Sequence, residues 1–318
     1  MRTLVLGGGG PIGQAVVRAF AARGDDVYWT SRQSGPPTGA AVGHIRLDRS
    51  RPNDVAQTIG TQRIDTVVDM VAYGIAGTQP LLDAMQDDLR RYVLVSSCDV
   101  YRNYGLLHRL EAGEADGSPL DESSPLRTCR FPYRGPAARE SGAADRWMDD
   151  YDKIPIEAAV RALPCNWTIL RLPMVYGPGD RQRRFRWAIA PMLSRAASLQ
   201  APSTWLDWTT TYGFIDNVAA AVAHCAGHEQ AANTTVNVTD EPAMHHRNWV
   251  ERLRLVTGWS GTLEATEAET SFSRAIEGLD LSVPLDVSAD RLFTDLDFAP
   301  PVAVDAAARL TVADEVAR

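Results

Sequence analysis

Residues 3–13 read Thr3-Leu4-Val5-Leu6-Gly7-Gly8-Gly9-Gly10-Pro11-Ile12-Gly13. A short apolar run, typical of a buried strand, leads directly into a glycine turn, and the turn leads into a helical pattern over residues 11–22. The GxxGxxG spacing permits a tight turn, close approach of the backbone to a pyrophosphate, and close packing of helix on strand. The phosphates would rest on the amides that begin the helix. The residues expected to contact such a dinucleotide are Gly7, Gly10, Pro11, Ile12 and Gly13.

The rest of the first half alternates short β-rich runs with helical patterns, as is typical of a parallel sheet with crossover helices. The expected strands are residues 2–6, 27–30, 44–47, 66–71, 92–96 and 167–172. The expected helices are residues 11–22, 54–59, 80–86 and one that ends near residue 163. The strands look apolar on both faces. The sequence therefore predicts an α/β fold, a Rossmann doubly wound parallel sheet, over residues 1–178.

Residues 179–318 are expected to form a smaller α/β region that caps the first and completes a substrate cleft, with some strands free to join the main sheet. The pattern favours helices at residues 186–197, 217–226 and 247–257 and strands at 211–215 and 235–238. Between residues 100 and 143 lies a stretch that is too long for an ordinary connection. We interpret it as a functional loop beside the cleft, with a surface insertion as the alternative.

Composition excludes several classes of function. No apolar run is long enough to span a membrane, and the strand pattern begins at residue 2, so we expect a cytoplasmic protein without a signal peptide. A net charge of -8 disfavours nucleic acid as a partner. The cysteines form no CxxC pair, so we expect neither a metal site nor a disulfide framework. They are Cys98, Cys129, Cys165 and Cys225.

The end of the second strand bears on the choice of coenzyme. Sites that prefer NAD usually place an acid there, whereas this chain has Ser31 and Arg32. Arg32 is suited to a 2′-phosphate, which favours NADP; an arginine stacked on the adenine of NAD is the alternative. Asp48, after the third strand, is placed to accept from the adenine amino group, or else it is a solvated loop acid.

With these residues in place, the chain resembles the extended short-chain dehydrogenase/reductase superfamily, specifically NAD-dependent epimerase/dehydratase-like proteins. The segments that carry the resemblance are residues 67–73, 92–101, 170–179, 212–219 and 237–239. In this family the first of these strands ends at the nicotinamide ribose. The resemblance therefore implies coenzyme contacts from Val71, Ala72, Tyr73 and Pro173.

The resemblance also implies catalytic residues. Ser97, three residues before Val100, matches the serine or threonine that hydrogen-bonds the reacting oxygen of the substrate. Lys153 matches the lysine that holds the nicotinamide ribose and lowers the pKa of a neighbouring tyrosine. It is the single lysine beside 31 arginines, so either its position needs a compact ammonium or its placement is an accident.

The general acid/base is where the chain departs from the family. The family places a tyrosine four residues before the lysine, and this chain has Asp149, which we expect to form an ion pair with Lys153. Tyr151 can replace it if Pro155 delays the helix and Asp152 caps it, because residues two apart in an extended segment share a face.

Tyr133, in the long loop, is a second candidate for the proton carrier, and loss of proton transfer is the remaining alternative. Cys98 and Asp99 stand where sugar dehydratases of the family carry Asp and then Glu, so we do not expect 4,6-dehydration.

We therefore expect an NAD(P)-dependent oxidoreductase or epimerase that acts on a hydroxyl or carbonyl carbon of a nucleotide sugar or secondary metabolite, with NADP favoured over NAD. The alternative is an NAD(P)-binding sensor or scaffold without redox turnover. Members of the family suggest a homodimer. An arginine cluster follows the glycine-proline turn at residues 177–179, where relatives grip a diphosphate; a solvated helix face is the other interpretation. Its members are Arg181, Arg183, Arg184 and Arg186.

Overall fold

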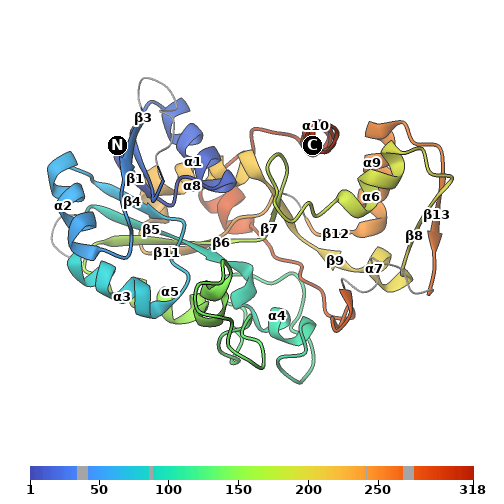
Figure 1. Cartoon of the computed structure of the whole chain (residues 1–318), viewed down its shortest axis with the longest axis horizontal. Helices are drawn as coiled ribbons and strands as arrows, with labels where there is room; N and C mark the ends of the chain where they lie inside the picture. Colours follow the sequence, from blue (N-terminus) through green and yellow to red (C-terminus); the bar gives the residue numbers. More distant parts are fainter. Residues whose placement is uncertain (34–41, 86–88, 241, 268–275) are drawn as a thin grey trace.

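The computed structural model describes residues 1–33, 42–85, 89–240, 242–267 and 276–318. Its centre is a seven-stranded sheet in the order β11-β6-β5-β4-β1-β2-β3 (Figure 1), and every neighbouring pair is parallel. This order confirms the expected Rossmann doubly wound sheet. The strands are β1 (Arg2–Leu6), β2 (Asp26–Ser31), β3 (Val42–Arg46), β4 (Thr66–Asp69), β5 (Arg91–Ser97), β6 (Asn166–Leu172) and β11 (Thr234–Asn237).

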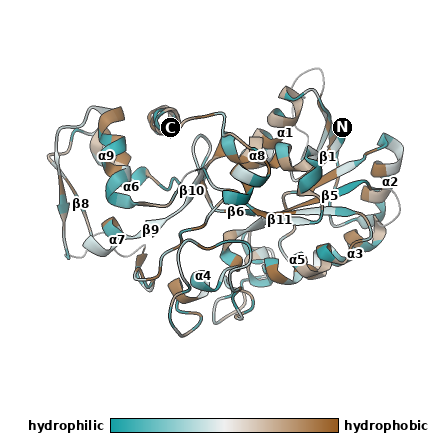
Figure 2. Ribbon diagram, turned by 180° about the vertical axis from the view of Figure 1, so that it is seen from behind, coloured by the Kyte–Doolittle hydropathy of each residue, from teal (hydrophilic) through white to brown (hydrophobic). Residues whose placement is uncertain are grey.

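Successive residues of the central strands pack into two different cores. Val5 and Val68 point into the core that contains α1 (Pro11–Ala22) and α8 (Ile215–Gly227). Leu4 and Val67 point the other way, into the core that contains the remaining crossover helices. Both faces of the sheet are therefore covered, and Figure 2 shows helices that are hydrophobic on one side and hydrophilic on another. The helices of the second core are α2 (Pro52–Gln62), α3 (Ile75–Ala84) and α5 (Lys153–Arg161).

The second half of the chain belongs partly to the sheet and partly to a smaller capping region. Strand β11 extends the sheet beyond β6, and α8 packs on α1. The capping region consists of short strand pairs and helices beside the carboxyl ends of the sheet strands (Figure 1). Its helices are α6 (Arg186–Leu193), α7 (Ser203–Asp207), α9 (His246–Thr257) and α10 (Val304–Ala317). Its strand pairs are β7 (Met174–Tyr176) with β10 (Tyr212–Phe214), β8 (Ser198–Ala201) with β13 (Thr262–Ala265), and β9 (Thr209–Thr210) with β12 (Met244–His245).

The long loop after β5 contains one short helix, α4 (Arg102–Leu107), and then runs without helix or strand to a 3-10 turn at Arg146–Asp150. Specific contacts hold it in place. Arg102 forms an ion pair with Asp116, and the backbone of Leu120 exchanges hydrogen bonds with residues 286 and 288. None of the helices in the described ranges is long and apolar enough to cross a membrane.

A candidate active site at the carboxyl ends of the strands

The glycine turn between β1 and α1 has little room for a larger residue at several positions, of which Gly7 and Gly13 are the most crowded. Gly7 has a φ of +80°, and a Cβ there would lie 2.4 Å from Val71 Cγ1; a Cβ on Gly13 would lie 2.6 Å from the carbonyl oxygen of Gly7. At Gly10 a Cβ would meet no atom of the described residues within 4 Å. Gly10 is also the N-cap of α1, with Pro11 in the first turn and no side-chain cap bond. The open space and the amides at the start of α1 suit a pyrophosphate.

The far end of this region is formed by the ends of β2 and β3. The Gly7 amide lies 3.4 Å from Thr30 Oγ1, and Ser31 Oγ lies 2.9 Å from His44 Nε2. Asp48 is exposed and accepts from the amide and hydroxyl of Ser50 at 2.9 and 2.8 Å, which together with the charge of Arg32 lowers its pKa. Arg32 and Asp48 therefore lie near each other at this end of the sheet.

The segment after β4 joins the glycine turn to α5. Val71 contacts Gly7, and its amide donates to Asp69 Oδ1 at 3.0 Å. The carbonyl oxygen of Tyr73 accepts from the amide of Asp152, at the start of α5, at 2.9 Å. Pro173, after β6, packs beside Gly213.

Lys153 is 3% exposed and begins α5. Its Nζ donates to the carbonyl oxygens of Ala72 at 2.7 Å and Val95 at 2.8 Å, so it links the ends of β4 and β5. Nζ also lies 5.5 Å from the ring centre of Tyr73 and 5.6 Å from that of Tyr151. Burial lowers the pKa of the ammonium to about 8.

The expected ion pair between Asp149 and Lys153 is wrong. Asp149 lies in the 3-10 turn, where its carboxylate accepts from the amide of Arg139 at 2.8 Å and pairs with the guanidinium groups of Arg139 and Arg146. The physical reason is that α5 begins only at Lys153, with Asp152 as its N-cap, so residues 149 and 153 are not on one helix. The carboxylate of Asp149 instead fastens the long loop, because Arg139 also donates to the carbonyl oxygen of Tyr133 at 3.1 Å.

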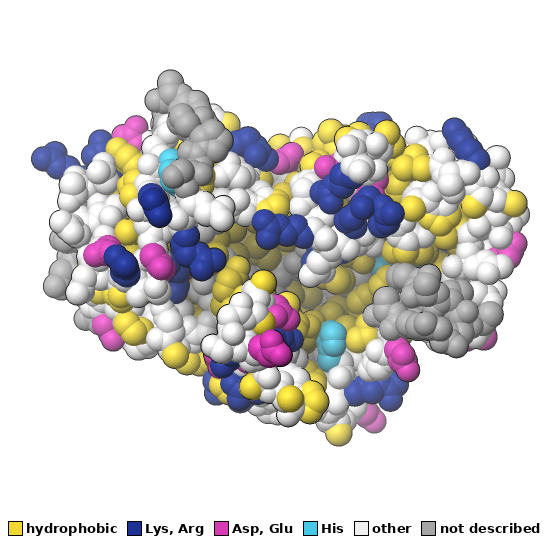
Figure 3. Space-filling view, viewed as in Figure 1, with side chains coloured by type: hydrophobic (Ala, Val, Ile, Leu, Met, Phe, Trp, Pro, Cys, Tyr) yellow, Lys and Arg dark blue, Asp and Glu magenta, His cyan; other side chains and the backbone are white. Residues whose placement is uncertain are grey.

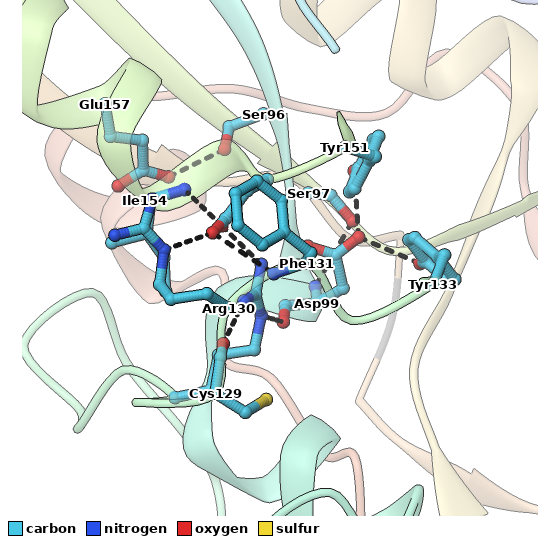
Figure 4. Close-up of polar contacts among 12 residues, drawn as sticks. Ser96, Ser97, Asp99, Cys129, Arg130, Phe131, Tyr133, Tyr151, Ile154 and Glu157 are labelled. Carbon is cyan, nitrogen blue, oxygen red and sulfur yellow. Dashed lines mark hydrogen bonds and ion pairs between the residues drawn. The ribbon is translucent and has the colours of Figure 1, made fainter. Parts of the chain in front are cut away.

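Both candidate tyrosines meet at one carboxylate that was not among the expected site residues. Tyr151 precedes the helix with an extended backbone, and its hydroxyl donates to Asp99 Oδ2 at 2.8 Å. The hydroxyl of Tyr133 donates to the same oxygen at 2.9 Å, and the two ring centres are 5.0 Å apart. Figure 4 shows both phenol groups directed at the same carboxylate oxygen of Asp99.

Ser97 completes this group at the end of β5. Its Oγ accepts from the amide of Asp99 at 3.2 Å and interacts with the hydroxyl of Tyr151. Burial and the charge of Asp99 hold the pKa of Tyr151 well above its usual value, and they do the same for Tyr133. Ser97, Asp99, Tyr133 and Tyr151 thus bring a hydrogen-bond donor set and an acid together, with both phenols neutral at ordinary pH.

Two buried ion pairs lie next to this group of residues. Arg127 donates to the carbonyl oxygen of Asp99 at 2.8 Å and forms a buried ion pair of 2.8 Å with Asp152, which ties the helix cap to the site. Glu157 accepts from Ser96 at 2.7 Å and pairs with Arg171 at 2.8 Å.

The molecular surface is hollowed between the sheet and the capping region. Figure 3 shows hydrophobic side chains lining this hollow and Lys or Arg side chains gathered along its upper rim. Most of the arginine cluster is engaged: Arg183 and Arg186 pair with Glu315 on α10, and Arg184 pairs with Asp180. Arg181 is exposed and forms no ion pair with the described residues, and its charge acts on Tyr73.

Comparisons with known proteins identify relatives of this chain. The chain is 26% identical over 270 residues, 81% of its length, to 2'-dehydrokanamycin reductase from Streptomyces kanamyceticus. It spans 59% to 67% of the length of the curated relatives that it matches.

Solved structures show the same fold. UDP-glucuronic acid 4-epimerase from Bacillus cereus in complex with NAD superimposes with a TM-score of 0.69 at 17% identity, covering 99% of this chain and 96% of that one. UDP-glucose 4-epimerase with UDP-glucose from Thermotoga maritima gives a TM-score of 0.68 at 16% identity, covering 100% and 99%. The family model described as NAD dependent epimerase/dehydratase family matches residues 3–239. The chain therefore belongs to the NAD-dependent epimerase/dehydratase family.

Proposed function

We propose that the protein is an NAD(P)-dependent oxidoreductase or epimerase that acts on a hydroxyl or carbonyl carbon, with Tyr151 as the proton carrier in place of a tyrosine at position 149. The observation that supports this most is the meeting of Tyr151 with Ser97 and Asp99 beside the buried Lys153. A neutral phenol next to a serine hydroxyl at the mouth of a coenzyme site is suited to moving a proton to or from a substrate oxygen.

The coenzyme would lie along the carboxyl ends of the strands. Its pyrophosphate fits the amides at Gly10, its adenosine end fits Arg32 and Asp48, and its nicotinamide ribose fits the third donor of Lys153, since two donors bind carbonyl oxygens. When bound, it supplies the hydride donor or acceptor for the reaction. Arg32 favours NADP, because a guanidinium binds a phosphate in two places at once.

The chain's own residues supply orientation and the proton. Ser97 would donate to the reacting oxygen and Tyr151 would exchange its proton with that oxygen. The substrate we propose is a nucleotide sugar or a related polar metabolite, since solved proteins of this fold bind UDP-sugars and two curated relatives are reductases. Arg181, which is exposed and whose charge acts on Tyr73, would meet its anionic part.

The experiment is calorimetry with NAD+, NADP+ and their reduced forms, followed by absorbance assays of the nicotinamide with a panel of UDP-sugars, alcohols and ketones. We expect nucleotide binding, turnover with at least one panel member, and loss of the NADP preference in Arg32→Ala. Binding without turnover of any compound would favour the sensor or scaffold alternative, which the raised pKa of Tyr151 also suits. Absence of binding to either nucleotide would refute both.

A further inference from the structure

The carboxylate of Asp99 is buried and forms no ion pair with a side chain of the described residues. The residue is 4% exposed, and Oδ2 accepts from two phenols, whereas Oδ1 has no hydrogen-bond partner among the described residues. Arg127 binds the backbone oxygen of Asp99 rather than its carboxylate, and no ion pair to Asp99 forms within the described chain. A buried carboxylate is costly to charge unless it is compensated; here two phenol hydroxyls bind it directly, and the charges of Arg127 and Lys153 act on it from a longer distance.

This arrangement differs from the tyrosine and lysine device that the family resemblance implies. Lys153 donates two hydrogen bonds to the carbonyl oxygens of Ala72 and Val95, and its Nζ lies 5.6 Å from the ring centre of Tyr151. The hydroxyl of Tyr151 instead donates to an acid. The negative charge of the site therefore lies on a carboxylate one hydrogen bond behind the phenol, rather than on the phenol itself.

We propose that Asp99 is the proton acceptor and donor of the reaction, and that Tyr151 relays the proton between Asp99 and the substrate. This inference rests on the proposed function. In the oxidative direction the O–H bond of the substrate breaks and its proton moves to the Tyr151 oxygen, while the original proton of Tyr151 moves to Asp99 Oδ2. The hydride leaves the substrate carbon with its electron pair for the oxidised pyridine nucleotide. In the reductive direction both proton transfers run backwards.

A path leads from Asp99 towards the surface of the long loop. Tyr133 donates to the same carboxylate oxygen, and Tyr104 is hydrogen-bonded to Tyr133. The ring of His108 lies 4.3 Å from that of Tyr104, and both side chains are partly exposed. The hydroxyls of Tyr133 and Tyr104 would return the proton towards solvent after each turnover.

Asp99→Asn separates the chemistry from the packing. The amide has the size of the carboxyl group, and its oxygen still accepts from Tyr133 and Tyr151, but it takes up no proton. Asp150→Asn is the matched control, because Asp150 is on the neighbouring turn, is exposed, and among the described residues forms ion pairs with Arg134 and Arg146 alone. Both variants lose one negative charge.

The first readout needs no substrate. Ultraviolet titration of phenolate absorbance in the apoprotein should show tyrosines ionising at lower pH in Asp99→Asn than in the wild type, with no change in Asp150→Asn, since a buried charge beside two phenols has been removed. The same titration in Asp99→Asn/Tyr151→Phe assigns the shift to Tyr151. The titratable or charged groups that face Asp99 and must be included in the fit are Cys98, Tyr104, His108, Arg127, Tyr133, Tyr151 and Lys153.

The second readout is turnover of the panel compound identified for the wild type. We expect Asp99→Asn to lose about 10²–10⁴-fold in kcat, with a larger solvent isotope effect and unchanged nucleotide affinity. The double variant with Tyr151→Phe should be no slower than the slower single variant, as for residues that act as a unit. Turnover of Asp99→Asn equal to that of Asp150→Asn, or an unshifted phenolate titration, would overturn the relay. Failure of the wild type to bind either nucleotide refutes the proposed function instead.

Discussion

The glycine turn at residues 7–13 and the tyrosine group around Asp99 lie at the same edge of the sheet, but they are assembled in different ways. The turn is local: its conformation depends on glycines between β1 and α1, among them Gly7 and Gly13, where a larger residue would clash. The tyrosine group gathers side chains from residues 97–99, 133 and 151, which meet only after the long loop has folded over β5. A local device persists wherever its short motif persists, whereas an assembled one can exchange its parts.

Asp149 illustrates such an exchange. The position that holds the family's tyrosine has become a fastening point for the loop, through Arg139 and Arg146. The phenol that we propose as proton carrier, that of Tyr151, lies two residues further along the chain, where the backbone is extended before the cap of α5. If Tyr151 carries the proton, as we propose, the reacting group is fixed by its place in space rather than by its spacing from the lysine.

The largest expected effect tests the tyrosine group around Asp99. Tyr151→Phe keeps the ring and its packing but removes the hydroxyl between Ser97 and Asp99, so kcat should fall about 10²–10⁴-fold while nucleotide affinity is unchanged. Tyr133→Phe leaves the bond between Tyr151 and Asp99 intact and should cost about tenfold or less. Nicotinamide absorbance assays and calorimetry measure the two quantities. Full turnover in both variants and in the double variant would remove proton transfer by these tyrosines.

The next effect concerns Lys153, which lies between the glycine turn and the tyrosine group around Asp99. Its pKa falls from 10.5 to about 8 in the folded protein, so the unfolded chain binds more protons than the folded one between these values. The resulting penalty is fully present below about pH 8 and is relieved as pH rises towards 10.5.

Relative to Lys153→Met, the wild type should therefore gain up to about 3 kcal/mol of unfolding free energy over that range. Urea unfolding of both proteins at several pH values measures the difference, and buried tyrosines common to the two proteins cancel in it. A difference that does not vary with pH would show that the ammonium is not desolvated.

The glycine turn and the elements around it were easier to predict from the sequence than the tyrosine group around Asp99. Helix α1 has the bounds expected of it, and the sheet strands deviate from expectation by a few residues at their ends, because apolar periodicity and glycine spacing act over short distances. Helix α10 was not expected. Since its Glu315 pairs with Arg183 and Arg186, the sequence alone suggested more unengaged guanidinium groups than the fold leaves.

Asp99 and Asp149 show why the tyrosine group and the loop around it were harder to predict from the sequence. The partners of Asp99 are 34 and 52 residues away along the chain, and nothing in the local pattern indicates which phenols reach it. One signal was present: an acid at the end of an apolar strand, between Ser97 and Val100, is unusual at a buried position. The delayed start of α5 could be predicted from Pro155 and Asp152, whereas the choice of Arg139 as partner of Asp149 depends on the loop.

Two glycine substitutions sharpen the comparison from the coenzyme side. In Gly13→Ala the new Cβ would press on the carbonyl oxygen of Gly7 at 2.6 Å, so unfolding free energy should fall by about 1–3 kcal/mol along with nucleotide affinity. Gly10→Ala meets open space and should leave stability within about 1 kcal/mol while it weakens nucleotide binding. Thermal unfolding and calorimetry on the pair separate the two effects. Equal nucleotide affinity in Gly10→Ala and wild type would mean that the pyrophosphate lies elsewhere.

The smallest expected effect tests whether a tyrosine at position 149, the usual position in the family, can carry the proton. Asp149→Tyr restores the common residue, but position 149 faces Arg139 and Arg146 rather than Lys153. Introduced into Tyr151→Phe, it should leave kcat no higher than in Tyr151→Phe alone, and it should make the loop more susceptible to limited proteolysis because Arg139 loses the more buried of its two carboxylate partners. Asp145→Asn, which removes a more exposed partner of Arg139, is the control for loop loosening. Recovery of turnover in the double variant would show that spacing from the lysine, and not the place in space, determines which residue carries the proton.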